Sequence, residues 1–158
     1  MKIRDADYKF TMYRICDGVF QRGKMHKLST DLKMEMFERY DIYNVVGLAP
    51  SYSDPGLQEL DKSQFINYYF LPISDGKLHD NVTDKLLQLA KRLARKVEAG
   101  RGVLCHCNAG RNRSGLLNAL IVMELLQCSG EQAMEIVREQ RPRAIDNLHF
   151  EEFLRGLK

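Results

Sequence analysis

The stretch from His106 to Gly115, HCNAGRNRSG, decides the fold because it joins two apolar runs of different spacing. The run before it, residues 102–106, is typical of a buried strand, and the run after it, residues 116–123, is typical of a buried helix. A tight loop between a strand and a helix start presents backbone N–H groups to an anion, with the positive end of the helix dipole behind them. The sequence therefore predicts an oxyanion-binding loop.

Cys107 and Arg113 add a nucleophile and a guanidinium to this predicted loop. A thiol attacks only as its thiolate, and a helix N-terminus with a ring of amides favours that form, so we expect Cys107 to be reactive. Arg113 offers a planar fork that matches two oxygens of a phosphate, which lysine does not. Gly110 and Gly115 allow backbone turns that a side chain would obstruct.

The other loop residues are expected to assist. Ser114 can form a hydrogen bond with the sulfur and help it leave in a second step, whereas His106 is predicted to order the loop by hydrogen bonds to backbone. A base is unnecessary for a thiolate that is already formed. The residues expected to line the anion site together with Arg113 are Asn108, Ala109, Gly110, Arg111 and Asn112.

HCNAGRNRSG resembles the Cys-x5-Arg-Ser/Thr signature of the cysteine-dependent protein phosphatases, and the chain length of 158 residues resembles their compact dual-specificity branch. The resemblance implies hydrolysis of phosphotyrosine through a phosphocysteine intermediate, with phosphoserine and phosphothreonine as further candidate substrates. It implies no metal or other cofactor, and a phosphorylated protein as the partner. Val19-Phe20-Gln21-Arg22-Gly23 is similar to an entry segment of atypical members.

The segment Phe70-Leu71-Pro72-Ile73-Ser74-Asp75 resembles the acid loop of the same family, and Asp75 lies 32 residues before Cys107. Asp75 is expected to protonate the leaving oxygen and then to deprotonate the water that hydrolyses the cysteinyl phosphate. An aspartate in a loop is also often a turn residue. Asp80 and Asp84 are alternative acids, but Asp80 is expected to cap the following helix and Asp84 to lie in its first turn.

Three further features keep alternatives open. Asp146-Asn147-Leu148-His149-Phe150 resembles a late motif whose asparagine braces the catalytic loop, but Asn147 equally suits a helix cap. Cys105 lies two residues before Cys107, so it is either a core residue or the partner of Cys107 in a protective disulfide. A metal site at Cys105-His106-Cys107 is disfavoured, because it lacks a second pair of ligands at a useful spacing. The basic cluster that either receives acidic substrates or forms a solvated helix end is Arg138, Arg141 and Arg143.

Three other functions can be compared with this pattern. Asn112-Arg113-Ser114-Gly115 is similar to the Asn-Arg-Thr-Gly of RNA 5′-triphosphatases in this superfamily, and nucleic acid would then be the partner. Those enzymes generally lack a matching acid, so the presence of Asp75 argues against this function. Phosphoinositide phosphatases often have lysines where this loop has Asn108 and Asn112. A non-catalytic phosphate-binding module usually lacks the cysteine, the arginine or the acid, and all three are present.

Strands alternating with helices predict the α/β class, with one domain over residues 1–158 and a mostly parallel sheet flanked by helices. Asp75 and Cys107 each follow a predicted strand, where ligands of such sheets bind. The predicted elements are a hairpin over 9–22 about Asp17-Gly18, a helix capped by Ser29 or Thr30, a strand over 41–49, a loop-rich stretch over 51–64, a strand over 65–71, a helix over 80–99, a strand over 102–106, a buried helix to about 128, and helices over 130–140 and 147–157.

The composition is that of an ordinary globular protein, with 44% hydrophobic and 28% charged residues. A net charge of +3 suits an anionic substrate without requiring nucleic acid. The sequence has no apolar run long enough to cross a bilayer, and its first ten residues are too charged for a secretory signal. We therefore expect a cytoplasmic or nuclear protein without a membrane partner, whose oligomeric state the composition leaves open.

Overall fold

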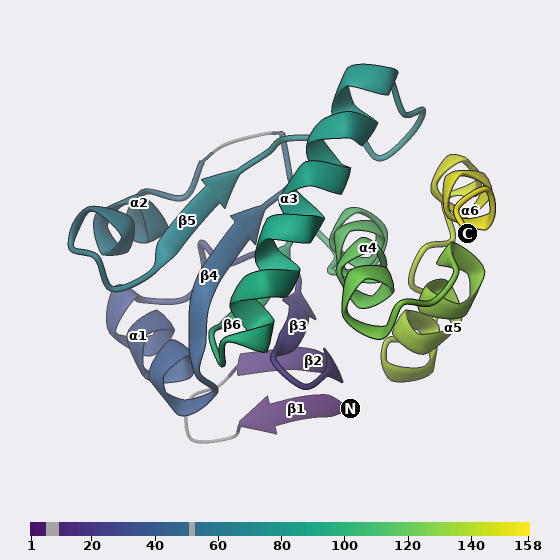
Figure 1. Ribbon diagram of the computed structural model, residues 1–158. Helices are drawn as coiled ribbons and strands as arrows, with labels where there is room; N and C mark the ends of the chain where they lie inside the picture. The colour runs from purple at the N-terminus through teal and green to yellow at the C-terminus, as the bar shows by residue number, and fades with distance from the viewer. Residues whose placement is uncertain (6–9, 51–52) are drawn as a thin grey trace.

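A computed structural model describes residues 1–5, 10–50 and 53–158, so the predicted starts at Lys9 and Ser51 lie outside the described residues. Helices and strands alternate along the chain as predicted (Figure 1). In chain order they are β1 (Lys2–Asp5), β2 (Phe10–Cys16), β3 (Val19–Arg22), α1 (Thr30–Arg39), β4 (Ile42–Gly47), α2 (Pro55–Lys62), β5 (Asn67–Phe70), α3 (Asp80–Glu98), β6 (Gly102–His106), α4 (Arg113–Leu126), α5 (Gly130–Gln140) and α6 (Leu148–Arg155).

The sheet has the strand order β1-β2-β3-β6-β4-β5. β3, β6, β4 and β5 run parallel to one another, whereas β1 and β2 are added in antiparallel pairs at one edge. The predicted α/β class with a mostly parallel sheet is therefore confirmed. β6 lies between two parallel neighbours, so the residue that follows it emerges near the middle of the sheet.

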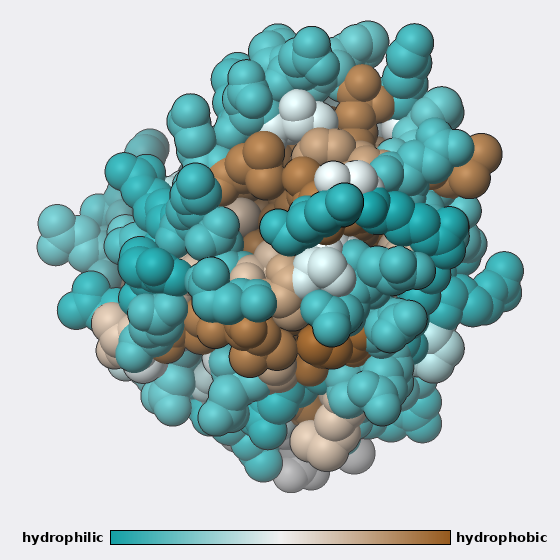
Figure 2. Space-filling view, turned by 45° about the vertical axis from the view of Figure 1, so that its right-hand side comes forward, coloured by the Kyte–Doolittle hydropathy of each residue, from teal (hydrophilic) through white to brown (hydrophobic). Residues whose placement is uncertain are grey.

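Helices cover both faces of the sheet and produce two hydrophobic cores. The helices α3 to α6 gather on one side and α1 and α2 on the other (Figure 1). Successive residues of a strand point to opposite faces, so Val103 and Cys105 pack in the core under α3 to α6, whereas Leu104 packs in the core under α1. Figure 2 turns the α4–α6 side forward and shows apolar side chains between a majority of polar ones.

Hydrogen bonds at helix ends explain where several elements begin. The Ser29 hydroxyl accepts the N–H of Leu32 (3.1 Å) and caps α1, as predicted. The prediction that Asp80 caps α3 is wrong, because the N-cap is His79, which makes no side-chain cap bond. Asp80 is instead the first residue of α3, where a carboxylate still interacts favourably with the helix dipole.

Two elements were not predicted. The stretch over 51–64 was expected to be loop-rich, but it contains α2, whose N-cap Asp54 accepts the N–H of Leu57 (3.1 Å). Proline at the first helical position after an aspartate is a helix-start signal, so this sequence feature was available. β1 lacked such a signal, because Lys2-Ile3-Arg4-Asp5 contains one apolar residue and pairs with β2 only in the folded chain.

In the described residues, no helix combines the length and the apolar character needed to cross a membrane.

Candidate active site

The predicted strand, loop and helix are present around Cys107. β6 ends at His106, Cys107 follows at once, and α4 begins at Arg113. The Asn112 side chain makes no cap bond to α4. The first N–H groups of a helix have no intrahelical partner, so this loop and helix start provide the donors that an oxyanion needs.

The loop is seated against the end of β3. The Cys107 N–H donates to the Arg22 carbonyl (3.4 Å), and the Gln21 side-chain amide donates to the Gly110 carbonyl (3.0 Å). Gly110 has φ of +67°, and a Cβ there would lie 2.6 Å from the carbonyl carbon of Arg22. Glycine is therefore required at this position for both its conformation and its space.

Ser114 lies beside the nucleophilic sulfur. The Cys107 Sγ and the Ser114 Oγ are 3.4 Å apart, and both residues are buried. A hydroxyl at this distance can donate to a thiolate, which is the geometry that the predicted role of Ser114 requires.

Arg113 connects the loop to the segment that carries Asp75. Its side chain is buried, and Nη1 donates to the carbonyl of Ile73 (3.3 Å). Its Nε, also buried, has no hydrogen-bond partner among the described residues. A buried, unpaired donor is costly unless a ligand satisfies it, so this guanidinium is oriented by protein on one side and has an N–H available for an anion.

Asp75 is held beside the loop by two amides. The Asn112 Nδ2 donates to one carboxylate oxygen (3.3 Å), and the Asn147 Nδ2 donates to the other (2.9 Å). The Asn112 Oδ1 in turn accepts the N–H of Asp146 (2.9 Å). The structure therefore brings Asp75 into contact with the loop that begins at Cys107, although the two are far apart in sequence.

Asn147 fulfils both roles that the sequence left open, with one difference. Its Oδ1 accepts the N–H groups of His149 (2.9 Å) and Phe150 (3.3 Å), which caps α6. Its Nδ2 braces Asp75 rather than the catalytic loop itself. The predicted brace thus acts on the acid segment, and it reaches the catalytic loop only through Asn112.

The predicted basic cluster is mostly structural. Arg138 donates to the carbonyls of Ala144 (3.0 Å) and Ile145 (2.6 Å). Arg141 donates to the carbonyl of Gly110 (3.2 Å), so it supports the catalytic loop from outside. Only Arg143 is exposed, and its backbone carbonyl accepts from Arg111 (3.3 Å).

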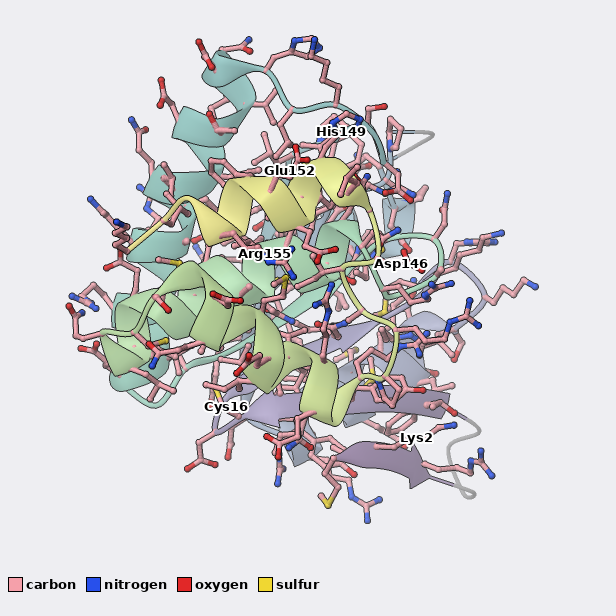
Figure 3. The ribbon with its side chains drawn as sticks, turned by 90° about the vertical axis from the view of Figure 1, so that its right-hand side faces the viewer. Lys2, Cys16, Asp146, His149, Glu152 and Arg155 are labelled. Carbon is pink, nitrogen blue, oxygen red and sulfur yellow. The ribbon has the colours of Figure 1, made fainter. Side chains whose placement is uncertain are left out.

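An ion pair and a buried amide complete the support of the loop. Arg111 pairs with Asp146, which Figure 3 labels on the segment between α5 and α6. Asn118 of α4 donates to the side-chain oxygen of Gln21 (3.0 Å), the residue whose amide holds Gly110. Sequence reasoning missed Gln21, Asn118 and the support from Arg141, because only the folded chain places these residues against the loop.

His106 is buried and neutral. Burial lowers its pKa from 6.5 to about 4, the nearby charge of Asp54 opposes this shift, and the charges of Arg22 and Lys33 reinforce it. Its Nε2 has no hydrogen-bond partner among the described residues, so the loop-ordering bonds predicted for His106 do not come from this nitrogen. A neutral imidazole here places no positive charge of its own behind the sulfur.

Cys105 is fully buried in the core under α3 to α6, and its thiol is free. Burial, followed by the proximity of Cys107, raises the pKa of Cys105 well above its ordinary value. These observations favour the core role over the redox role, because a thiol that resists ionisation is a poor partner in disulfide chemistry.

The chain matches the family model "Dual specificity phosphatase, catalytic domain" over residues 27–157, and it belongs to this family. It is therefore a protein phosphatase of the tyrosine and dual-specificity type, as the sequence predicted, and enzymes of this family act on phosphorylated proteins. No curated protein matches the chain in a sequence comparison.

Solved structures show the same fold. The crystal structure of Tk-PTP in the active form is 24% identical, with a TM-score of 0.75 over 92% of this chain and 95% of that chain. Human DUSP28 is 20% identical, with a TM-score of 0.71 over 92% of this chain and 90% of that chain. A human tyrosine phosphatase-like serine/threonine/tyrosine-interacting protein is 21% identical, with a TM-score of 0.73 over 92% of this chain and 93% of that chain.

Proposed function

We propose that the chain hydrolyses phosphotyrosine monoesters in proteins, and phosphoserine and phosphothreonine as secondary substrates, with Cys107 as the nucleophile. The Cys107 thiolate attacks phosphorus, an S–P bond forms, and the P–O bond to the leaving oxygen breaks. Asp75 donates its proton to that oxygen. The loop amides of residues 108–112 and the Arg113 guanidinium stabilise the charge on the phosphoryl oxygens.

The second step returns the enzyme to its starting state. Water attacks the cysteinyl phosphate, the Asp75 carboxylate takes a proton from the water, and the S–P bond breaks to release inorganic phosphate. Ser114, 3.4 Å from the sulfur, donates to the departing thiolate. Each proton taken in one step is given back in the other, and the proposed scheme uses no metal or cofactor.

The observation that carries the proposal is the pair of amides on Asp75. The Asn112 and Asn147 side chains, at 3.3 Å and 2.9 Å, hold this carboxylate beside the catalytic loop. A tyrosine oxygen is a poor leaving group unless it is protonated, so an acid at this place favours phosphomonoesters of protein side chains over RNA 5′-triphosphates. It also favours catalysis over mere binding of a phosphorylated protein.

We further propose that residues 1–158 form one catalytic domain that acts in the cytoplasm or the nucleus. Each of the four cysteines is a free thiol, and one of them is the proposed nucleophile. A reducing compartment keeps such thiols reduced, which supports this location.

The proposal is tested by comparing three substrates in the presence of EDTA: a phosphotyrosine peptide, its phosphoserine counterpart and a 5′-triphosphate RNA. We expect turnover to survive chelation and to be fastest on the phosphotyrosine peptide. Release of phosphate from the RNA alone would contradict the proposed substrate class, and loss of all turnover on chelation would contradict the metal-free mechanism.

Replacing Asp75 with asparagine is expected to lower kcat on a phosphotyrosine peptide by about 10²-fold or more, because general acid catalysis typically contributes 10²–10⁴-fold. The loss on p-nitrophenyl phosphate is expected to be smaller, since its leaving group depends less on protonation. Steady-state kinetics on both substrates measures this difference. The matched control is Asp84→Asn, an exposed carboxylate of α3 that should leave both rates unchanged. Equal losses on the two substrates would argue against an acid role for Asp75.

A further inference from the structure

Three successive carbonyls of the catalytic loop are hydrogen-bonded from outside the loop. Arg141 donates through Nη2 to the Ala109 carbonyl (3.4 Å) and through Nε to the Gly110 carbonyl (3.2 Å). The N–H of Ile145 donates to the Arg111 carbonyl (3.4 Å). Both donor residues lie on the segment between α5 and α6, so this segment holds the outer side of the loop.

The direction of these carbonyls sets the direction of the N–H groups that follow them. In a planar trans peptide, the C=O and the next N–H point in opposite directions. With the carbonyls of residues 109–111 held outward, the N–H groups of Gly110, Arg111 and Asn112 are therefore directed toward the interior of the loop. No described residue accepts a hydrogen bond from these three groups. Gly110, with φ of +67°, supplies the left-handed residue that lets consecutive N–H groups converge on an anion.

Gln21 is the buried side chain that holds the middle carbonyl of the three. It is fully buried in β3, and its Nε2 donates to the Gly110 carbonyl (3.0 Å). Gln21 pairs with Cys105 of β6, so its side chain lies on the face of the sheet that α4 covers. Burying an amide in a core is unfavourable unless the amide is hydrogen-bonded, and an apolar residue would avoid that cost. The bond to the catalytic loop therefore indicates a role for Gln21 beyond packing.

Asn118 of α4 determines which end of the Gln21 amide faces the loop. Asn118 is fully buried, and its Nδ2 donates to the Phe20 carbonyl and to the Gln21 Oε1 (both 3.0 Å). Because this donor is paired with the Gln21 oxygen, the Gln21 nitrogen is turned toward Gly110. A flipped Gln21 amide would lose the Asn118 bond and place its oxygen against the Gly110 oxygen, and two acceptors repel each other.

We propose that Gln21 is a positioning residue for phosphoryl transfer: its amide, oriented by Asn118, fixes the peptide between Gly110 and Arg111 so that the Arg111 N–H faces a phosphoryl oxygen. Donors fixed in advance stabilise a transition state well, because they need no reorientation when charge develops. The inference rests on the proposed function, in which this loop binds the phosphoryl group. A purely structural role for the two amides would change the stability of the core without a separate effect on anion binding.

The test replaces both amides with apolar side chains of similar size, in the double variant Gln21→Met/Asn118→Leu. Removing both partners of a buried hydrogen bond together is often nearly neutral for stability, so we expect a thermal midpoint close to that of the wild type. On p-nitrophenyl phosphate, kcat/KM should fall by about 10-fold, a part of the roughly 10²–10³-fold loss that removal of a whole oxyanion donor causes. The loss is partial because Arg141 still holds the Gly110 carbonyl. The inhibition constant of tungstate, a tetrahedral oxyanion, should rise by a similar factor.

Asn44→Leu is the matched control. Asn44 is another fully buried amide of the sheet, and its Nδ2 donates to the carbonyls of Arg101 and Gly102 (both 3.4 Å). It lies in β4 opposite Val103, near the start of β6, whereas the catalytic loop follows the end of that strand. This variant should lower the thermal midpoint, because the two carbonyls lose a donor, but kcat/KM and the tungstate inhibition constant should keep their wild-type values.

A folded double variant with wild-type kcat/KM and wild-type tungstate inhibition would overturn the inference and leave the proposed function intact. An equal loss of kcat/KM in Asn44→Leu would also overturn it, because the effect would then follow stability. A wild type that neither hydrolyses p-nitrophenyl phosphate nor binds tungstate would overturn the proposed function and this inference together. If circular dichroism shows that the double variant does not fold, Asn118→Leu takes its place. It keeps Gln21 but frees its amide to turn, so the same losses are expected at a smaller size.

Discussion

Replacing Cys107 with serine is expected to reduce hydrolysis of p-nitrophenyl phosphate by about 10⁵-fold, to the limit of detection. A serine hydroxyl is not ionised at neutral pH, whereas the proposed mechanism requires an ionised nucleophile. The loop that follows β6 is held by Gln21 and Arg141, which both donate to the Gly110 carbonyl. Because these contacts do not involve the Cys107 side chain, the loop should persist in the variant. Initial rates in the presence of EDTA measure the loss.

Cys128→Ser is the control for this experiment. Cys128 is a half-buried free thiol beyond the end of α4, and its replacement should leave the rate unchanged. Because the Cys107→Ser loop still presents its amides and Arg113, we expect the variant to bind a phosphotyrosine peptide. Hydrolysis by Cys107→Ser at a rate close to that of the wild type would show that the nucleophile lies elsewhere.

Replacing Arg113 with lysine is expected to lower kcat/KM by about 10³-fold, although the formal charge is unchanged. Arginine donates through one nitrogen to the Ile73 carbonyl and has a buried, unpaired Nε. Lysine offers a single point charge, which cannot make the first bond and bind two phosphoryl oxygens in the same plane. Steady-state kinetics on p-nitrophenyl phosphate measures the effect.

Arg143→Lys provides the comparison for Arg113→Lys, because Arg143 is exposed on the neighbouring segment. We expect this variant to keep the wild-type kcat. The role given to the guanidinium fork would be contradicted if Arg113→Lys retained more than about a tenth of the wild-type kcat/KM. Such a variant would have lost less than about 1.4 kcal/mol of transition-state stabilisation.

The local part of the fold and site could be predicted from the sequence. The apolar runs on either side of HCNAGRNRSG set the strand and the helix, and the loop between them is short enough for its residue types to indicate its geometry. The same holds for the start of α1, where the sequence offered Ser29 and Thr30 as candidate caps and the structure selects Ser29. In each case the residues that act together are neighbours in the chain.

Most of the long-range contacts could not be predicted, although the positions of Asp75 and Cys107 beyond the ends of two strands could. Gln21 supports Gly110 only because β3 pairs with β6, and Asn112 reaches Asp75 only because two loops meet at the same edge of the sheet. Nothing in the spacing of these residues encodes such a contact. The Asp80 cap failed for a related reason: its type suits a cap, but the backbone begins the helix one residue earlier.

The most direct test of the proposed mechanism is to look for the phosphoryl group on Cys107. The wild type and Asp75→Asn are mixed with p-nitrophenyl phosphate, quenched within one turnover, digested and analysed by mass spectrometry. We predict that the peptide containing Cys107 gains the mass of one phosphoryl group, and that this form accumulates more in Asp75→Asn because the water attack is slowed. Turnover with Cys107 unmodified at every time point would contradict the phosphocysteine mechanism.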